Sequence, residues 1–322
     1  MSDKPGLLAL YHFSPWFTDE LKKRFDVFGP FPTREIAPHM VPDDFKPRVR
    51  AIATVGSIGE GGRAMLDALP NVSIIHCYGT GFERMDLKTA KERGIVITNA
   101  ADSNASAVAD IAVGLLLAST RRIAEGDRYI RAGRWERRGA HLWPPILGLK
   151  GAKVGVLGLG AIGMRIATRI AAFEAEIGYH SRSQKPDVPW AYLPSALALA
   201  QWCDFLIVAL RSDASNRHII NMELLKKLGP LGHVVNISRG MAVDEAALAD
   251  ALEAGVIAGA ALDVFEEEPV VHPKLMTLEN VVMTPHLGGG TRQANRAMGE
   301  TALANFDAHF AGKPVLTPVP MD

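Results

Sequence analysis

The stretch KVGVLGLGAIG, residues 153–163, decides the fold of this chain. Its first five residues form an apolar run typical of a buried parallel strand, and a helical pattern begins near Ile162. Between them, Gly158, Gly160 and Gly163 have the spacing Gly-x-Gly-x-x-Gly. The first glycine permits a tight turn, the second lets the backbone approach a pyrophosphate, and the third lets helix and strand pack closely. The stretch therefore predicts a dinucleotide-binding strand–turn–helix unit.

The start of this helix supports the same interpretation. Its free N–H groups and the positive end of its dipole attract phosphates. We expect Leu159, Ala161 and Ile162 to contact the dinucleotide together with the three glycines. The alternative is a glycine-rich turn without a ligand, which this strand-and-helix context disfavours.

The tip of the next strand indicates which dinucleotide fits. An NAD site has Asp or Glu there, roughly 20 residues after the glycines, to hold the ribose 2′-hydroxyl. This chain has Ser181-Arg182-Ser183 at the tip, and the carboxylates of Glu174 and Glu176 come too early. A guanidinium flanked by two hydroxyls suits a phosphate monoester. The tip therefore predicts NADP(H) in preference to NAD(H), with an ordinary solvated turn as the alternative.

Outward from this stretch, apolar runs alternate with helical patterns, as in parallel strands joined by crossover helices. The predicted strands are Leu7–His12, Arg50–Val55, Val72–Cys77, Ile95–Thr98, Lys153–Leu157, Glu176–His180, Phe205–Leu210, Val234–Ile237, Ile257–Leu262 and Val281–Met283. The predicted helices after the glycines are Ile162–Phe173, Ser195–Gln201, Met222–Leu228, Glu245–Ala254 and Thr291–Phe310, and a long buried helix covers residues 104–126. With 322 residues, the pattern predicts two α/β domains.

Composition limits the partners and the compartment. The 35 acidic and 35 basic residues cancel, which gives no reason to expect nucleic acid or an anionic membrane as partner. Cys77 and Cys203 lie in apolar runs, which indicates buried thiols and no disulfide framework. We see no signal peptide, no spanning segment and no metal-ligand spacing, so we expect a cytoplasmic protein without a metal.

The segment of residues 129–149 is irregular and rich in arginine and tryptophan, including Trp143. Exposed Trp and Arg together are typical of subunit interfaces, whereas the alternative is a loop folded back on its own domain. Composition alone leaves both interpretations open.

Three segments stand at strand ends in the second half of the chain: NISRG at residues 236–240, LDVFEEEP at 262–269 and TPHLGG at 284–289. Ligands of open parallel sheets bind beyond the carboxyl ends of the strands. Arg239, a glutamate of the acidic run and His286 would thus meet near a nicotinamide. Each alone has a plainer interpretation, as a surface arginine, a solvated glutamate or a core histidine.

With the glycine fingerprint, these segments resemble those of the D-2-hydroxyacid dehydrogenases in order and spacing. The resemblance covers nearly the whole chain and is greatest to the NADPH-dependent glyoxylate/hydroxypyruvate reductases, because of the Ser-Arg-Ser tip. It implies two Rossmann-like or flavodoxin-like domains with parallel sheets and an active site in the cleft between them. Residues 1–101 and 287–322 would form the substrate-binding domain, and residues 102–286 the dinucleotide-binding domain, with 127–150 as a dimerisation arm.

The resemblance also implies roles for the catalytic side chains. Arg239 would hold the substrate carboxylate and polarise the 2-keto oxygen, which its planar fork suits. His286 would donate the proton to that oxygen, and Glu268 would pair with His286 and favour the imidazolium. Hydride would pass from the nicotinamide C4 to the substrate C2 and give the D-alcohol. Glu266 and Glu267 are interpreted as solvated neighbours, because Pro269 marks Glu268 as the motif position.

Further contacts follow from the same resemblance. Asp263 would lie near the nicotinamide ribose or amide and support the catalytic pair. The remaining predicted cofactor contacts are Ala209, Leu210, Arg211, Ile237 and Gly288. The first domain would bind the substrate carboxylate through backbone N–H groups at two glycine-containing strand ends, with Val55, Gly56, Tyr78 and Gly79. Trp143 aligns with a tryptophan that reaches the partner subunit's active site in similar reductases, which favours a homodimer.

These features predict an NADPH-dependent reductase of small 2-keto acids such as glyoxylate, hydroxypyruvate or 2-ketogluconate, with phenylpyruvate still open. One alternative is an NAD-dependent D-2-hydroxyacid or phosphoglycerate dehydrogenase, which would favour an acidic cofactor tip. An alternative of another class is a dinucleotide-sensing corepressor on the same fold. Formate or phosphite oxidation would use this scaffold too, but no sequence feature favours either.

Overall fold

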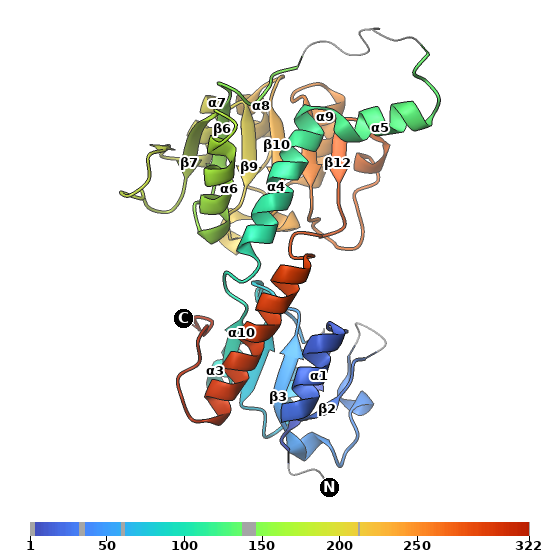
Figure 1. Ribbon diagram of the computed structural model, residues 1–322, viewed down its shortest axis with the longest axis vertical. Helices are drawn as coiled ribbons and strands as arrows, with labels where there is room; N and C mark the ends of the chain where they lie inside the picture. The colour runs from blue at the N-terminus through green and yellow to red at the C-terminus, as the bar shows by residue number, and fades with distance from the viewer. Residues whose placement is uncertain (1–3, 32–35, 59–61, 137–145, 212, 322) are drawn as a thin grey trace. The chain divides into compact units, whose positions relative to one another are not determined.

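The structure is a computed structural model that describes residues 4–31, 36–58, 62–136, 146–211 and 213–321. The chain folds into two compact units (Figure 1). One unit comprises residues 1–104 and 289–322, and the other comprises residues 105–288. The chain leaves the first unit after Asn104 and returns to it at Gly289, so the C-terminal helix completes the N-terminal unit.

A five-stranded parallel sheet forms the centre of the first unit. Its strands lie in the order β2-β1-β3-β4-β5, which is the flavodoxin-like arrangement. The strands are β1 (Gly6–Ala9), β2 (Asp26–Phe28), β3 (Val49–Thr54), β4 (Ile74–Cys77) and β5 (Val96–Asn99), and the helices are α1 (Pro15–Arg24), α2 (Gly62–Asp67), α3 (Leu87–Glu92) and α10 (Arg292–Phe310).

Helices α1 and α10 lie side by side on this unit (Figure 1). Pro15 starts α1 directly after its cap Ser14, and Thr291 caps α10 by accepting a hydrogen bond from the Ala294 N–H. Gly299 of α10 allows the two helices to approach closely, because a Cβ atom there would lie 2.7 Å from the ring of Trp16 in α1. The sequence pattern does not predict α1 or β2. The missed strand has only three residues, all half-buried, so it carries no apolar run.

A seven-stranded parallel sheet forms the centre of the second unit. The strands lie in the order β12-β11-β10-β9-β6-β7-β8, which is the dinucleotide-binding order 3-2-1-4-5-6 with one further strand at the edge. They are β6 (Lys153–Leu157), β7 (Glu176–His180), β8 (Ala191–Tyr192), β9 (Phe205–Val208), β10 (His233–Asn236), β11 (Gly259–Leu262) and β12 (Val281–Met283). Winding reverses between β6 and β9, so the strand order predicts a ligand at the carboxyl ends of these two strands.

Six helices accompany this sheet in the described residues: α4 (Ala105–Thr120), α5 (Ile123–Arg131), α6 (Ala161–Ala171), α7 (Ala196–Trp202), α8 (Met222–Leu228) and α9 (Glu245–Glu253). Side chains of Ser195, Asn221 and Asp244 cap α7, α8 and α9. Helix α4 packs against α6 and crosses β10 and β11 (Figure 1). Its many buried residues agree with the predicted buried helix.

The predicted single helix over residues 104–126 is wrong in its second part. Helix α4 ends at Thr120, and Arg122 adopts a left-handed conformation with φ of 53° before α5 begins. A residue with positive φ cannot continue a right-handed helix, so the chain changes direction there. Apolar composition continues across this break, and for this reason the sequence pattern conceals it.

None of the described helices is both long and apolar enough to cross a bilayer. Cys77 and Cys203 are buried, and burial raises the pKa of each thiol to about 12. The interpretation of both cysteines as buried thiols is thus confirmed.

Candidate active site

The glycine turn after β6 has the geometry that its sequence predicts. Gly158 has φ of 101°, and a Cβ atom there would lie 2.5 Å from the Cα of Leu210. A Cβ atom on Gly163 would lie 1.9 Å from the carbonyl oxygen of Gly158. Both positions therefore require glycine, because the obstructing atoms are backbone. Ala209 and Leu210, which follow β9, form the support of this turn.

Gly160 differs from the other two glycines. A Cβ atom there would meet no heavy atom within 4 Å, so no packing inside the chain requires glycine at this position. Gly160 is the N-cap of α6, and no side chain caps this helix start. A pyrophosphate at the helix start would use both features, the open approach and the uncapped N–H groups. Ala161 and Ile162 open the helix beside it, whereas Leu159 is buried in the core.

The tip of β7 presents the predicted phosphate-binding residues. The Ser181 hydroxyl donates to the Ser183 carbonyl at 2.7 Å, which forms a tight turn, and Arg182 is exposed. The sequence pattern does not point to one acidic residue near this tip, Asp213. Hydrogen bonds from Ser215 lower the pKa of the Asp213 carboxyl, and the charges of Arg211 and Arg182 lower it further. Arg182 and Arg211, which follow β7 and β9, therefore both act on Asp213. The sequence does not predict this, because β6 lies between the two strands in the sheet.

Asp263, at the end of β11, holds the segment that carries His286. Its Oδ1 accepts hydrogen bonds from the Thr284 hydroxyl at 2.6 Å and the Leu287 N–H at 2.7 Å, and its Oδ2 accepts from the Gly288 N–H at 2.8 Å. The side chain is almost completely buried. Asp263 and Gly288 are predicted cofactor contacts, but in this structure their polar groups bind each other, and Asp263 acts on the turn.

This turn gives His286 an unusual backbone conformation. His286 has φ of 53°, and its N–H donates to the Asp263 carbonyl at 2.9 Å. A non-glycine residue in the left-handed region costs about 1 kcal/mol or more and persists where neighbouring contacts enforce it. The bonds to Asp263 supply that enforcement.

His286 and Glu268 form the predicted pair. The Nδ1 atom of His286 lies 2.8 Å from Oε2 of Glu268, and the imidazole is about half exposed. Burial by itself would raise the pKa of the Glu268 carboxyl, but the hydrogen bond from His286 and the charges of His286 and Arg239 outweigh it and lower the pKa. Glu268 is thus an anion that accepts the Nδ1 proton, which leaves Nε2 directed away from it.

Arg239 follows β10 by three residues and lies close enough to Glu268 to lower the pKa of its carboxyl. Its Nη1 donates to the Ser238 carbonyl at 2.8 Å, and the residue is half-buried. Ile237, between β10 and Arg239, is buried. The structure therefore brings together Arg239, Glu268 and His286, which the sequence places at three strand ends.

In the first unit, Gly56 and Gly79 follow β3 and β4. Gly56 has φ of 97°, and a Cβ atom there would lie 2.8 Å from the Gly81 carbonyl oxygen. Val55, just before it, is 51% exposed, which is unusual for the residue after a buried strand. Both glycines thus lie just beyond the carboxyl edge of a parallel sheet, where ligands of such sheets bind.

Comparison with known proteins identifies the family. The profile described as D-isomer specific 2-hydroxyacid dehydrogenase, NAD binding domain, matches residues 113–288. The chain belongs to the D-isomer specific 2-hydroxyacid dehydrogenase family. It is therefore an oxidoreductase with a Rossmann-type NAD-binding domain, and the resemblance of the sequence motifs to this family is confirmed.

Relatives and solved structures of this dehydrogenase family cover almost the whole chain. Glyoxylate/hydroxypyruvate reductase A of Arabidopsis thaliana is 40% identical over 98% of both chains. Hydroxyphenylpyruvate reductase of Plectranthus scutellarioides is 41% identical over the same shares. The structure is similar to that of the NADPH-dependent glyoxylate/hydroxypyruvate reductase of Sinorhizobium meliloti in complex with NADP and malonate, with a TM-score of 0.91, 36% identity and coverage of 99% of this chain and 98% of that chain.

The side chain of Tyr78 has a structural role in the first unit of this dehydrogenase. Its hydroxyl donates to the Asn295 carbonyl at 2.7 Å, and its ring packs 5.0 Å from the rings of both Phe13 and Phe17. The side chain is buried in the first unit and links the loop after β4 to α1 and α10. The hydroxyl and the ring of Tyr78 are thus both held by contacts within the first unit.

The predicted arm falls partly outside the described residues, and Trp143 also lies outside them. Helix α5 takes up the first three residues of the segment that the sequence leaves irregular, up to Arg131. None of its residues is buried, and Ile123 and Ile130 are more than half exposed. Trp135, just beyond the helix, is 54% exposed.

The interpretation of Glu266 as a solvated neighbour is wrong. Its carboxylate binds Arg217 and His218, and its backbone N–H donates to Glu245. Glu267 is exposed, as expected. The sequence gives no warning of this contact, because Arg217 and His218 follow a different strand of the sheet.

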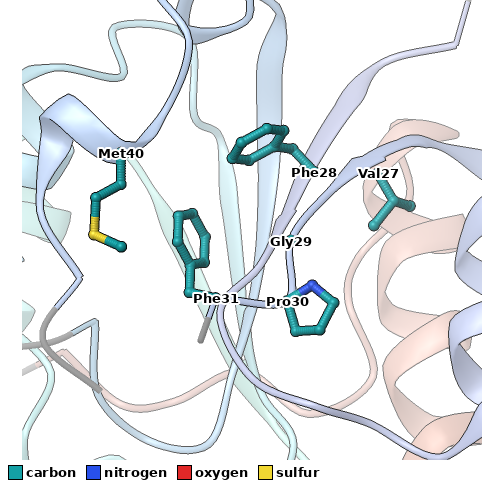
Figure 2. A pocket seen from close by; sticks show the side chains of 6 residues that line it. All are labelled: Val27, Phe28, Gly29, Pro30, Phe31 and Met40. Atoms are coloured by element: carbon teal, nitrogen blue, oxygen red, sulfur yellow. The ribbon is translucent and has the colours of Figure 1, made fainter. Parts of the chain in front are cut away.

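A pocket of about 430 Å³ lies in the first unit of the dehydrogenase (Figure 2). Figure 2 shows Phe28, Phe31 and Met40 among the side chains around it. Its lining is Val27, Phe28, Gly29, Pro30, Phe31 and Met40, which includes no titratable side chain and none of the predicted site residues. Among the described residues, the lining of this pocket thus has no acid–base group.

Proposed function

We propose that this dehydrogenase reduces small 2-keto acids to D-2-hydroxy acids with NADPH. The observation that carries the proposal is the His286–Glu268 pair at 2.8 Å, with Arg239 close to it and with all three residues at carboxyl ends of strands in a dinucleotide-binding sheet. An imidazole anchored by a carboxylate can hold a proton, and a guanidinium beside it can hold a carboxylate.

The dinucleotide would be held by the glycine turn. Gly158 and Gly163 shape the turn, and Gly160 with the uncapped start of α6 would bind the pyrophosphate. When bound, NADPH supplies a hydride to the C2 atom of the keto acid. Ile237, Asp263 and Gly288 remain predicted neighbours of the nicotinamide, with Asp263 acting through the turn that it holds.

The preference for the phosphorylated cofactor rests on charge. Ser181, Arg182 and Ser183 form an exposed tip without a carboxylate of its own, and Arg211 acts on the same region. The dianionic 2′-phosphate would gain charge-assisted hydrogen bonds there. Asp213 opposes it, so the two arginines must outweigh one acidic residue. The solved relative of Sinorhizobium meliloti is described as NADPH-dependent, which supports the proposal.

His286 would act as the proton donor. Because Glu268 accepts the Nδ1 proton, the Nε2 atom is the one that would donate to the 2-keto oxygen. The oxygen becomes an alcohol as hydride adds to C2, so one proton and one hydride are consumed for each keto acid. Glu268 would fix the orientation of the ring through its contact with Nδ1.

Arg239 would bind the substrate carboxylate and polarise the keto oxygen. Its planar fork can reach two oxygens of a 2-keto acid, which a lysine cannot do with fixed geometry. The family resemblance also assigns a carboxylate-binding role to backbone N–H groups at Val55, Gly56, Tyr78 and Gly79. Glyoxylate and hydroxypyruvate are the substrates favoured by the names of several relatives, and hydroxyphenylpyruvate in one relative keeps larger keto acids in the test.

We further propose a homodimer formed through α5 and the residues that follow it. Ile123, Ile130 and Trp135 are apolar and exposed on one segment of 13 residues, from 123 to 135. Burial of such a surface favours association, and a second copy of this chain is the partner that the predicted arm implies.

The test is a rate assay with a panel of 2-keto acids, each with NADPH and with NADH, in the native protein and in His286→Gln. We expect reduction of glyoxylate and hydroxypyruvate, a higher kcat/KM with NADPH, and a loss of kcat of about 10²- to 10⁴-fold in the variant with unchanged NADPH affinity. Full turnover in His286→Gln would refute the proton-donor role. No reduction of any keto acid by the native protein would refute the proposed activity.

A further inference from the structure

A second histidine–glutamate pair lies next to the proposed catalytic one. Both carboxylate oxygens of Glu266 lie near Nε2 of His218, at 3.0 and 3.1 Å, and Oε1 also accepts a hydrogen bond from Arg217. Glu266 is two residues before Glu268 on the same segment, and its side chain is only 25% exposed. The proposed chemistry assigns no role to this cluster of Arg217, His218 and Glu266, which we call the support cluster.

The support cluster joins three segments of the second unit. The His218 N–H donates to the Met241 carbonyl at 2.8 Å, and the Ile220 N–H donates to the Ala242 carbonyl at 2.9 Å. The Glu266 N–H donates at 2.7 Å to the carboxylate of Glu245, which is buried. The loop after β9 is therefore bonded through its backbone to the segment after Arg239 and through its side chains to the segment before Glu268.

Backbone packing makes this connection rigid. A Cβ atom on Gly240 would lie 1.8 Å from the carbonyl carbon of Phe265 and 2.1 Å from the nitrogen of Glu266. The segment that carries Arg239 thus lies directly on the segment that carries Glu268. The Phe265 N–H donates in turn to Oε1 of Glu268 at 3.1 Å, while Oε2 binds His286. Every link between Glu266 and His286 is a hydrogen bond or a short covalent connection.

From these contacts we infer that Glu266, held by Arg217 and His218, is a positioning residue for Arg239 and the His286–Glu268 pair. The inference rests on the proposed function. Glu266 does not touch the reacting atoms. It sets the spacing between the guanidinium that would hold the substrate and the imidazole that would donate the proton.

The energies involved allow a selective effect on catalysis. The cluster is partly exposed, with Arg217 at 54% and His218 at 30%, and ion pairs of that kind contribute only about 0–1 kcal/mol to folding. Displacement of catalytic groups by about 1 Å can reduce a rate by about 10²-fold. Loss of the cluster should therefore affect turnover far more than stability.

The chain offers a matched control, because Glu267 lies between Glu266 and Glu268 and is exposed. We expect Glu266→Ala to lower kcat by about 10- to 100-fold, with the Kd for NADPH within about twofold and a small change in Tm. Glu267→Ala should keep the native values. Equal kcat in the two variants, or a fall in kcat that merely follows a large fall in Tm, would overturn the inference.

Conservative replacement of the histidine gives a second test. In His218→Gln the amide nitrogen can still donate to Glu266, whereas His218→Leu has no donor. We expect kcat near the native value in His218→Gln and a loss like that of Glu266→Ala in His218→Leu. Equal loss in both would show that a hydrogen-bond donor at this position does not preserve kcat, and it would overturn the inference.

A readout without turnover separates this inference from the proposed function. Imidazole NMR of His286 reports the hydrogen bond of Nδ1 to Glu268 whether or not a keto acid is reduced. We expect the His286 resonances to shift in Glu266→Ala and to stay in place in Glu267→Ala. If the native protein reduces no keto acid, the proposed function fails. If the resonances of His286 are unchanged in Glu266→Ala, the positioning role fails.

Discussion

At the scale of single residues, the proposed cofactor preference depends on one exposed side chain. Arg182 is exposed at the tip of β7, so its side chain does not contribute to the packing of the core. We expect Arg182→Ala to lower kcat/KM for NADPH by about 10- to 100-fold, because a charge-assisted hydrogen bond contributes about 1.5–3 kcal/mol. The value for NADH should change by less than about threefold.

Steady-state rates with both cofactors at a saturating keto acid measure this difference. Lys185→Ala, at another exposed position on the same loop, is the control. A native preference for NADH, or equal losses with both cofactors in Arg182→Ala, would contradict the assignment of the 2′-phosphate to this tip.

At the scale of elements, two glycines of the β6–α6 unit have different roles: we expect Gly163 to be needed for stability and Gly160 for binding. Gly163→Ala should destabilise the protein by about 3 kcal/mol, because the new Cβ atom would lie 1.9 Å from a backbone oxygen that cannot move away. Gly160→Ala meets no atom within 4 Å, so we expect native stability but dinucleotide binding weaker by about tenfold or more.

Thermal unfolding and a fluorescence titration with NADPH distinguish the two variants. Native affinity in Gly160→Ala would show that the open side of this turn is not where the pyrophosphate binds. A stable Gly163→Ala protein would mean that helix α6 can move away from β6 at little cost.

The elements also show how far sequence patterns reach. Strands β6, β7 and β12 begin and end at the predicted residues, because buried parallel strands are continuous apolar runs. Strand β2 and the break at Arg122 were missed. The first is a short edge strand, and the second depends on one backbone angle inside an apolar stretch. Such features are set by packing that no local pattern records.

At the scale of the whole molecule, two of the described histidines, one in each unit, have a pKa that burial lowers well below its usual value. Burial lowers the pKa of His76 in the first unit to about 3 and that of His233 in the second unit to about 4. In the unfolded chain both would titrate near 6.5. Above that pH neither state binds the proton, so stability is independent of these groups. As the pH falls below about 6.5, the unfolded chain binds protons that the folded state does not bind, and stability is lost.

Between pH 7.5 and 5.5 we expect the free energy of unfolding to fall by about 1 to 1.5 kcal/mol for each histidine. Urea unfolding at the two pH values measures this change. His76→Phe should remove about half of it, because a phenyl ring can occupy the site beside Phe306 without titrating. A pH dependence that is the same in His76→Phe and in the native protein would contradict this account.

Association is a second property of the whole molecule. Ile130→Glu places a charge on the exposed apolar side of α5, and we expect it to convert the proposed homodimer to a monomer in analytical ultracentrifugation. Leu231→Glu is the control, because Leu231 is more exposed, at 72%, and lies away from α5 in the loop before β10. A dimer that persists in Ile130→Glu would place the interface elsewhere.

The sequence by itself determined the two α/β domains and the dinucleotide turn, and its resemblance to the family indicated Arg239, Glu268 and His286 as the residues of the proposed site. The turn depends on a steric requirement that acts within a few residues, because a Cβ atom on Gly163 would lie 1.9 Å from the carbonyl oxygen of Gly158. Only the tertiary structure decided what Asp263, Tyr78 and Glu266 do. Their partners lie on other strands, helices and loops, so their hydrogen bonds arise when the sheets form. A carboxylate in an acidic run is indistinguishable from its neighbours until the fold supplies its donors.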